Sequence, residues 1–148
     1  MRALFQILVI PYRRTTSGTE FGILKRSDAD YWQFIAGGGE DNETPVQAAE
    51  RETEEEIGVG AIGQLMRLDS IATVPKNNFA DSELWGSDIY VIPEHAFAVE
   101  VGNKLIILSH EHTEYRWVSY TDADKLLKWD SNRNALWELN ERLKKIPS

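Results

Sequence analysis

Residues 37–59, GGGEDNETPVQAAERETEEEIGV, decide how the rest of this 148-residue chain is interpreted. The stretch holds eight acidic side chains and one basic side chain, whereas the whole chain holds 24 acidic and 16 basic ones. The remaining residues are therefore almost neutral, and the net charge of −8 is concentrated in one segment. Carboxylates held this close together repel one another, so we expect a cation to neutralise them.

The second half of this stretch predicts a helix between Thr44 and Gly58. Thr44 can cap the helix, and Pro45 suits the first helical position because its missing N–H would be unpaired there in any case. Gln47, three residues after Thr44, completes a capping box. Gly58 can end the helix because glycine readily adopts a left-handed conformation.

On a helix with 3.6 residues per turn, Glu52, Glu55 and Glu56 share one narrow sector. Like charges four residues apart cost about 0.2–0.5 kcal/mol per pair, and carboxylates in the last turn face the negative end of the helix dipole. Helix stability therefore does not explain the pattern. Hard carboxylate oxygens on one face are what Mg²⁺ or Mn²⁺ requires, although a solvated acidic face is the ordinary alternative.

The spacing of these residues resembles the Nudix box, G-x5-E-x7-R-E-U-x-E-E-x-G-U, in which U is a bulky aliphatic residue. The matching positions are Gly37, Glu43, Arg51, Glu52, Glu55, Glu56, Gly58 and Val59. Thr53 departs from the pattern at the first aliphatic position, but a β-branched side chain can still pack there. Asn42 stands where many members carry glycine, and asparagine tolerates a left-handed turn better than most residues do.

Resemblance to the Nudix family implies a mixed β-sheet sandwiched between α-helices, an α/β (α+β) fold. It also implies a hydrolase that uses Mg²⁺ or Mn²⁺ to cleave phosphoric anhydride bonds. The implied metal ligands are Glu52, Glu55, Glu56 and the Gly37 carbonyl. By the same resemblance, Glu43 and Arg51 form a pair that braces the loop against the helix.

Motifs outside the box are similar to those of the dihydroneopterin triphosphate pyrophosphatase branch, which also accepts nucleotides such as dATP. They are Asp30–Gln33, His110–His112, Tyr115–Trp117 and Trp129–Arg133. This resemblance implies a pyrophosphohydrolase that converts a (deoxy)nucleoside or pterin triphosphate to the monophosphate and pyrophosphate.

In that branch a glutamate before the Tyr-x-Trp strand helps to bind metal, and Glu111 is the matching position. Glu111 is therefore a candidate fourth ligand or general base, with an ordinary polar loop residue as the alternative. His110 and His112 are interpreted as loop groups or groups behind the ligands, because the site is already rich in hard oxygen donors. His95 is interpreted as structural or exposed.

Five residues are candidate substrate contacts: Arg2, Lys25, Arg26, Phe79 and Ser131. The three basic side chains lie where the branch places phosphate-binding groups, but each could equally be a solvated charge. Phe79, with Trp85, could stack on a substrate ring, although core packing also accounts for Trp85. Ser131 could touch substrate or only cap the last helix.

The order of predicted elements supports this fold. Strands are expected at residues 3–12, 21–26, 32–36, 67–74, 87–92, 97–108 with a turn at 102–103, and 114–119. After the acidic helix, a short helix is expected to be opened by the capping residues 121–124. Asp130 or Ser131 should cap a last helix whose apolar stripe is Leu136, Leu139 and Leu143.

Composition limits the remaining possibilities. A chain of 148 residues with 42% hydrophobic content suits one domain, residues 1–148. No cysteine is present, which excludes disulfides and thiolate chemistry. No apolar run resembles a signal peptide or a membrane span, so a cytoplasmic location is expected. Without a basic stripe, no nucleic-acid polymer is expected as partner; the expected partner is a small polyphosphate, and monomer and homodimer both remain open.

Three other functions stay open. Pro75, 16 residues past the box, is similar to a position in ADP-ribose and nucleotide-sugar pyrophosphatases. Residues 32–34 resemble dinucleoside polyphosphate and RNA-cap hydrolases, but Ala36 departs from the glutamine usual there. A noncatalytic nucleotide-binding sensor is the alternative of a different class, although such proteins usually lose box glutamates. Isopentenyl-diphosphate isomerases share the fold but use a cysteine, which this chain lacks.

Overall fold

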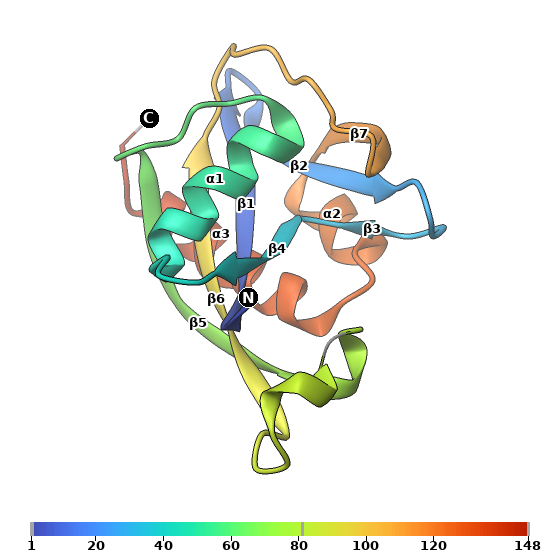
Figure 1. Cartoon of the computed structure of the whole chain (residues 1–148). Coiled ribbons are helices and arrows are strands. Elements are labelled where there is room, and N and C mark those ends of the chain that lie inside the picture. Colours follow the sequence, from blue (N-terminus) through green and yellow to red (C-terminus); the bar gives the residue numbers. More distant parts are fainter. Residues whose placement is uncertain (1, 81, 148) are drawn as a thin grey trace.

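The structure, a computed structural model, describes residues 2–80 and 82–147. Its strands and helices (Figure 1) are β1 Arg2–Thr15, β2 Gly18–Arg26, β3 Trp32–Gln33, β4 Ile35–Glu40, α1 Pro45–Ile57, β5 Leu65–Pro75, β6 Val91–Glu100, β7 His112–Val118, α2 Tyr120–Leu126 and α3 Asp130–Lys144. Two short 3₁₀ turns, Lys76–Asn78 and Ser82–Trp85, lie between β5 and β6. None of the helices described is long and apolar enough to cross a membrane.

Strand β1 is the centre of the sheet. It pairs antiparallel with β2 and β4 and parallel with β6, and β5 continues the sheet beyond β6. On the other side, β2 pairs with both β3 and β7. The chain between β3 and β4 therefore passes from β2 to β1. This crossing carries the glycine-rich segment, residues 37–39, to the middle of the sheet.

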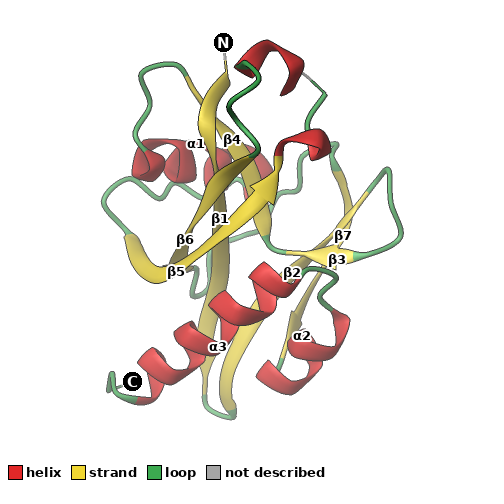
Figure 2. Cartoon of the chain, turned by 90° about the horizontal axis from the view of Figure 1, so that it is seen from below, coloured by secondary structure: helices red, strands yellow, loops and turns green. Residues whose placement is uncertain are grey.

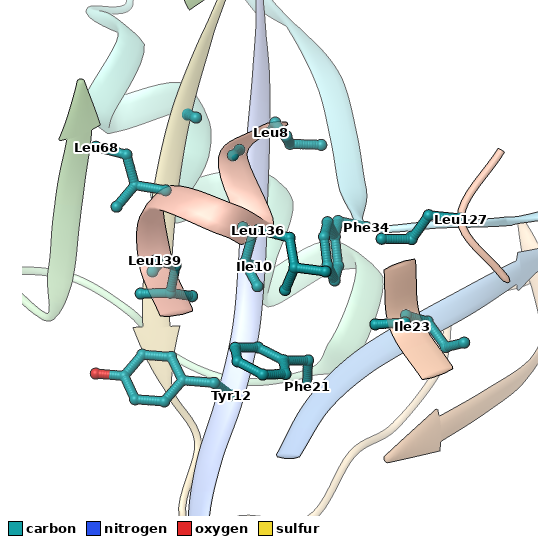
Figure 3. Close-up of a cluster of buried hydrophobic side chains, with 14 of the residues drawn as sticks. Leu8, Ile10, Tyr12, Phe21, Ile23, Phe34, Leu68, Leu127, Leu136 and Leu139 are labelled. Carbon is teal, nitrogen blue, oxygen red and sulfur yellow. The ribbon is translucent and has the colours of Figure 1, made fainter. Parts of the chain in front are cut away.

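Side chains of β1 alternate between two hydrophobic clusters. Ile7 and Val9 pack toward α1, whereas Leu8 and Ile10 pack toward α3. Figure 3 shows the second cluster, in which Leu8 and Ile10 of the sheet meet Leu136 of the helix. Because both faces are covered, the strand is a continuous apolar run, as expected for a buried strand. Figure 2 shows the helices on either side of the sheet, which confirms the predicted mixed sheet between helices.

Helix α1 has the predicted ends. The Gln47 N–H donates to the Thr44 hydroxyl at 3.3 Å, and the Thr44 N–H donates to the Gln47 side chain at 2.9 Å. Pro45 occupies the first turn, and Gly58 ends the helix with φ of 70°. Asn42, in the loop before the helix, also adopts a left-handed conformation, with φ of 73°.

The strand predictions were wrong at three places. Residues 32–36 form two strands rather than one, because the chain changes neighbours at Phe34, whose N–H donates to the Asn132 side chain. Residues 87–90 lie outside the strands, and β6 begins at Val91 and runs on through residues 93–96, which no predicted strand covered. Residues 104–108 are not a strand, because this segment bonds to the end of α1 instead: the Ile107 N–H donates to the Ile57 carbonyl at 2.9 Å.

The predicted caps of the last two helices were also wrong. Ser119, not Thr121, caps α2, and its hydroxyl accepts a hydrogen bond from the Asp122 N–H. Trp129 is the N-cap of α3 and makes no side-chain capping bond; Asp130 instead pairs with Arg133. The apolar stripe of α3 at positions 136, 139 and 143 is buried, as predicted.

Glu138 fastens α3 to strand β5. Its carboxylate accepts hydrogen bonds from the Asp69 N–H and the Ser70 N–H, both at 2.7 Å, and from the Ser70 hydroxyl at 2.6 Å. Arg142 of the same helix donates to it at 2.7 Å. Burial alone would raise the pKa of Glu138, but these hydrogen bonds outweigh that effect and lower it below its ordinary value.

Candidate active site

A cavity of about 870 Å³ opens at the N-terminal end of α3 and is large enough for a nucleotide-sized ligand. Its lining comes from segments far apart in the sequence. They are Arg2 and Gln6 of β1, residues 26–29, Tyr31 and Gln33, residues 36–38, Glu52, residues 72–75, Asn78 and Phe79, Glu94, His110 and Glu111, and residues 129–132. The cavity thus joins the glycine-rich segment, the acidic helix, the loop before β7 and the start of α3.

The predicted metal ligands occupy different positions relative to this cavity. Glu52, Glu111 and Gly37 belong to the lining. Glu56 is buried behind them, with 3% of its side chain exposed. Glu55 is outside the lining, 57% exposed, and pairs with Arg51 at 3.3 Å. The structure therefore brings Glu52, Glu56 and Glu111 together and leaves Glu55 toward solvent.

Glu56 is the most unusual carboxyl group of the cluster. Burial, followed by its hydrogen bond with Glu52 and the charge of that neighbour, raises the pKa of Glu56 well above its ordinary value. Its Oε1 lies 3.5 Å from His112 Nε2, and burial lowers the pKa of this histidine, so the pair is not a salt bridge between charged groups. Glu56 Oε2 is buried and has no hydrogen-bond partner among the described residues.

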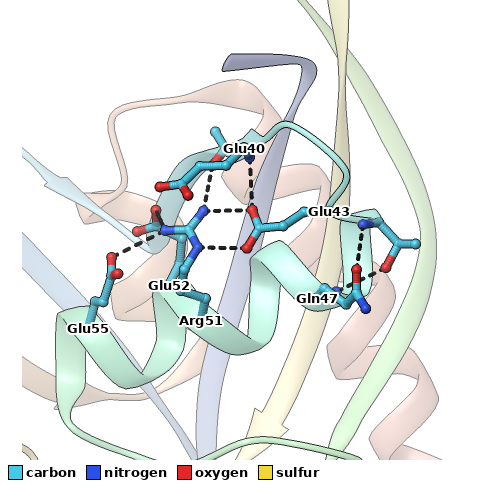
Figure 4. A network of polar contacts seen from close by, with 8 residues as sticks. Glu40, Glu43, Gln47, Arg51, Glu52 and Glu55 are labelled. Atoms are coloured by element: carbon cyan, nitrogen blue, oxygen red, sulfur yellow. Dashed lines mark hydrogen bonds and ion pairs between the residues drawn. The ribbon is translucent and has the colours of Figure 1, made fainter. Parts of the chain in front are cut away.

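Arg51 connects the loop to the helix, as Figure 4 shows. Its guanidinium donates to both oxygens of Glu43, to the Gly38 carbonyl at 3.0 Å and to Glu52 Oε1 at 2.9 Å. These hydrogen bonds raise the pKa of Arg51 and lower that of Glu43. Glu43 Oε1 also accepts the Glu40 N–H at 2.8 Å. Arg51 therefore fixes both the glycine-rich segment and the Glu52 carboxylate.

Glu111 is positioned by backbone bonds to both neighbouring segments. Its carbonyl accepts a hydrogen bond from the Ser27 N–H at 2.8 Å, which fastens it to the loop after β2. Two residues earlier, the Ser109 N–H donates to the Glu56 carbonyl at 3.2 Å. Although this segment is irregular, it is therefore held beside the end of α1, and the negative charge of Glu111 contributes to the raised pKa of Glu56.

The donor set fits a hard divalent cation. Glu52, Glu56 and Glu111 offer carboxylate oxygens, and Gly37 offers a carbonyl. The bare Oε2 of buried Glu56 is the clearest sign, because a cation would supply the partner that this atom lacks. The site is not preformed, however: in residues 2–80 and 82–147 no three His, Asp or Glu side chains converge tightly enough to hold a metal ion.

Two of the three predicted phosphate contacts lie in the cavity. Arg2 and Arg26 belong to its lining. Lys25 does not; its ammonium pairs with Asp30 at 2.8 Å and lies over the Trp32 ring. Strand β2 explains the difference, because successive side chains of a strand point to opposite faces, so only one of the two neighbours can reach the cavity.

Phe79 and Ser131, the other predicted contacts, also line the cavity. Phe79 packs against buried Trp85 at 5.5 Å between ring centroids, and the Arg2 guanidinium lies 4.5 Å from the Phe79 ring centroid. Trp85 itself is not in the lining, so of the two rings only Phe79 is available to a ligand.

Two polar residues of the lining, Gln6 and Glu94, belong to no motif that the sequence analysis identified, whereas Gln33 and Asn132 lie in the motifs outside the box. Gln33 accepts a hydrogen bond from the Trp129 indole at 3.2 Å. Glu94 interrupts an apolar strand at a position that the alternation of β6 points inward. A charged residue at an inward-facing position of a strand is the sequence signal that could have identified Glu94. The histidines lie as expected, with His110 in the lining, and His95 half-buried beside Arg67.

The family-model match and the relatives named as diphosphatases identify the chain as a hydrolase of phosphoric anhydride bonds. The NUDIX domain model matches residues 7–138, and the chain belongs to the Nudix family. Members of this family generally use divalent metals and act on small phosphate compounds.

Two proteins of named activity and one crystal structure are similar to this chain over most of its length. The dihydroneopterin triphosphate diphosphatase of Escherichia coli K12 is 31% identical over 132 residues, covering 88% of this chain and 87% of that protein. The asymmetrical bis(5'-nucleosyl)-tetraphosphatase of Sus scrofa is 31% identical and covers 91% and 87%. A crystal structure assigned to the Nudix hydrolases from Listeria monocytogenes is 47% identical, covers 95% and 94%, and superposes with a TM-score of 0.86.

Proposed function

We propose that the protein hydrolyses a pterin or deoxynucleoside triphosphate to the monophosphate and pyrophosphate, with Mg²⁺ or Mn²⁺ held by Glu52, Glu56 and Glu111. The observation that carries this proposal is the composition of one cavity. It combines carboxylates near Glu52, the guanidinium groups of Arg2 and Arg26, and the aromatic ring of Phe79. These are complementary to a cation, to phosphate oxygens and to a heterocycle, respectively.

A bound divalent cation would neutralise phosphate oxygens and acidify the attacking water. Residues of the protein position the carboxylate ligand, bind the phosphates and accept a proton. Arg51 fixes the Glu52 carboxylate, and Arg26 binds the phosphate chain. Glu111 is exposed at the lining, so as the alternative to binding the cation its carboxylate could accept the proton of the water. The Gly37 carbonyl is a further oxygen donor to the cation.

The similarity to the Escherichia coli dihydroneopterin triphosphate diphosphatase supports the triphosphate substrate. A dinucleoside tetraphosphate is the second candidate, because the Sus scrofa relative has the same identity over a similar share of the chain. Both candidates share the cleavage chemistry and differ in the group beyond the phosphates.

The test is a substrate panel with the purified full chain and Mg²⁺. It contains dihydroneopterin triphosphate, each dNTP, 8-oxo-dGTP, ADP-ribose and diadenosine tetraphosphate. Phosphorus NMR in ¹⁸O-labelled water identifies the products and the phosphorus that is attacked. Monophosphate and pyrophosphate from a triphosphate is the expected result. Turnover of diadenosine tetraphosphate alone would favour the second candidate, and turnover of ADP-ribose alone would refute both.

A further inference from the structure

Glu94 is a buried acid that the proposed phosphate chemistry does not use. Glu94 is 8% exposed and lines the cavity. In β6 it shares a face with Ala96 and Ala98, which belong to the hydrophobic cluster between the sheet and α3. Because α3 begins only at Asp130, this face loses its helix cover at Glu94 and meets the cavity instead.

The surroundings of Glu94 supply few hydrogen bonds. Burial raises the pKa of Glu94, and the nearby Ser131 side chain, at the start of α3, offsets part of this rise. No described Lys, Arg or His forms an ion pair with it. A carboxylate can accept about four hydrogen bonds, so most of its capacity is unused. A buried polar group with unused capacity in a cavity wall is a natural contact for a ligand.

The shape of the Glu94 carboxylate restricts which chemical groups it can bind. Its two oxygens accept two parallel N–H donors that point the same way. A 2-amino-4-oxopyrimidine ring, as in pterin and guanine, presents one ring N–H and one amino group in that arrangement. The hydrogen-bonding edge of adenine presents a donor beside an acceptor, which leaves one carboxylate oxygen facing a lone pair.

The rest of the lining suits such a ring. Phe79, Tyr31 and Trp129 belong to the same cavity, so an aromatic face is available to a flat heterocycle. The indole of Trp129 is held by Gln33 and contacts the Tyr31 ring edge-on, with centroids 5.5 Å apart. Aromatic side chains that line the same cavity as buried Glu94 can contact the face of a ring whose edge binds this carboxylate.

We propose that Glu94 is a specificity-determining residue that recognises the 2-amino-4-oxopyrimidine edge of the substrate ring. The proposal rests on the proposed function and deepens it, since it selects pterin and guanine triphosphates over adenine ones. It assigns Glu94 no part in bond cleavage.

The test compares dGTP, dITP and dATP in the presence of Mg²⁺. dITP differs from dGTP only by the missing 2-amino group, so this pair isolates the contact in the wild-type protein. We expect kcat/KM for dGTP to exceed that for dITP by at least about tenfold. Glu94→Gln has the same shape but offers one acceptor and one donor, so it should abolish the dGTP preference and raise the activity on dATP relative to dGTP.

Glu100→Gln is the matched control, because it makes the same change at an exposed position of the same strand, and it should leave the dGTP preference unaltered. Equal kcat/KM for dGTP and dITP in the wild type would overturn the proposal, as would an unchanged preference in a folded Glu94→Gln protein.

Binding measurements separate this proposal from the proposed function. Titration of tryptophan fluorescence with dGTP and dITP measures recognition whether or not the nucleotide is hydrolysed, because Trp129 lies in the cavity wall. A wild type that hydrolyses no triphosphate but binds dGTP more tightly than dITP would refute the proposed function and support the role of Glu94. Equal affinities would refute that role even in an active enzyme.

Discussion

The carboxyl group of Glu52 lies directly against the backbone of Gly37: a Cβ atom built on Gly37 would be 2.4 Å from Glu52 Cδ. No real Cβ contact is this short, so a side chain at residue 37 requires the carboxylate to move. Since Arg51 also holds Glu52, the position of this carboxylate is set from two sides.

Gly37→Ala tests the first of these constraints. We expect the methyl group to displace the Glu52 carboxylate and to lower kcat/KM by at least about tenfold, with a stability loss of about 1–3 kcal/mol. Gly60→Ala is the control, because a Cβ there meets nothing within 4 Å. Steady-state kinetics and denaturant unfolding check both variants, and equal activity of the two would contradict the assignment.

Arg51→Lys tests the second constraint. Lysine keeps the charge but loses the two-point bond to Glu43 and the planar arrangement that also reaches Gly38. We expect the free energy of unfolding to fall by about 1.5–3 kcal/mol, since these hydrogen bonds involve charged groups. Glu141→Gln removes an exposed ion pair to Lys144 and should cost at most about 1 kcal/mol. Urea unfolding of both variants measures the difference.

Glu52→Gln should remove Mg²⁺-dependent turnover while the protein stays folded. Mutation of a group that only supports a metal ligand lowers metal affinity or activity by about 10–100-fold. Loss of a ligand should therefore lower kcat/KM by at least about a hundredfold. Isothermal titration with Mn²⁺ should show weakened metal binding, and circular dichroism should be unchanged. Full activity in the variant would eliminate Glu52 as a ligand.

Arg26 and Lys25 are neighbours with different expected roles. Arg26→Ala should raise KM for the triphosphate several-fold, because Arg26 lines the cavity. Lys25→Ala should leave KM unchanged, because Lys25 pairs with Asp30 outside it. Kinetics over a range of substrate concentrations measures both, and an effect confined to Lys25 would reverse the assignment.

Glu138 gives a prediction for pH dependence. Its pKa is lower in the folded protein than the ordinary value of 4.5, so its contribution to stability is complete above that value and is lost as the pH falls through the folded pKa. Glu138→Gln should therefore lower stability at pH 7 and flatten the acid-induced loss of stability below pH 4.5. Urea unfolding at a series of pH values tests this, and parallel curves for the two proteins would contradict it.

The sequence predicted those parts of the fold that short-range chemistry determines. The capping box at Thr44 and the glycine at 58 define α1 without reference to the rest of the chain. The continuous burial of residues 7–12 in β1 likewise follows from its apolar run. The break at Phe34 was not predictable, because it depends on Asn132, 98 residues away. The irregular path of residues 104–108 depends in the same way on carbonyls at the end of α1.

The residues of the candidate site also differ in how far the sequence predicted them. The box glutamates were identified because their spacing places them on one helix. Glu94 was missed because the predicted strands did not include residues 93–96, so its inward-facing position in β6 was not recognised. The choice between Lys25 and Arg26 also needed the structure, since only the orientation of β2 decides which side chain faces the cavity.

The parallel pairing of β1 with β6 has a consequence for how the chain reaches its native state. Residues 6–12 lie beside residues 94–100, so β1 is synthesised almost ninety residues before the strand with which it pairs. Until then the pairing of β1 with β2 and β4 and the packing of α1 on one face are in place, but the parallel edge of β1 stays unpaired. Such distant contacts slow folding, so the nascent chain is exposed to aggregation until β6 leaves the exit tunnel.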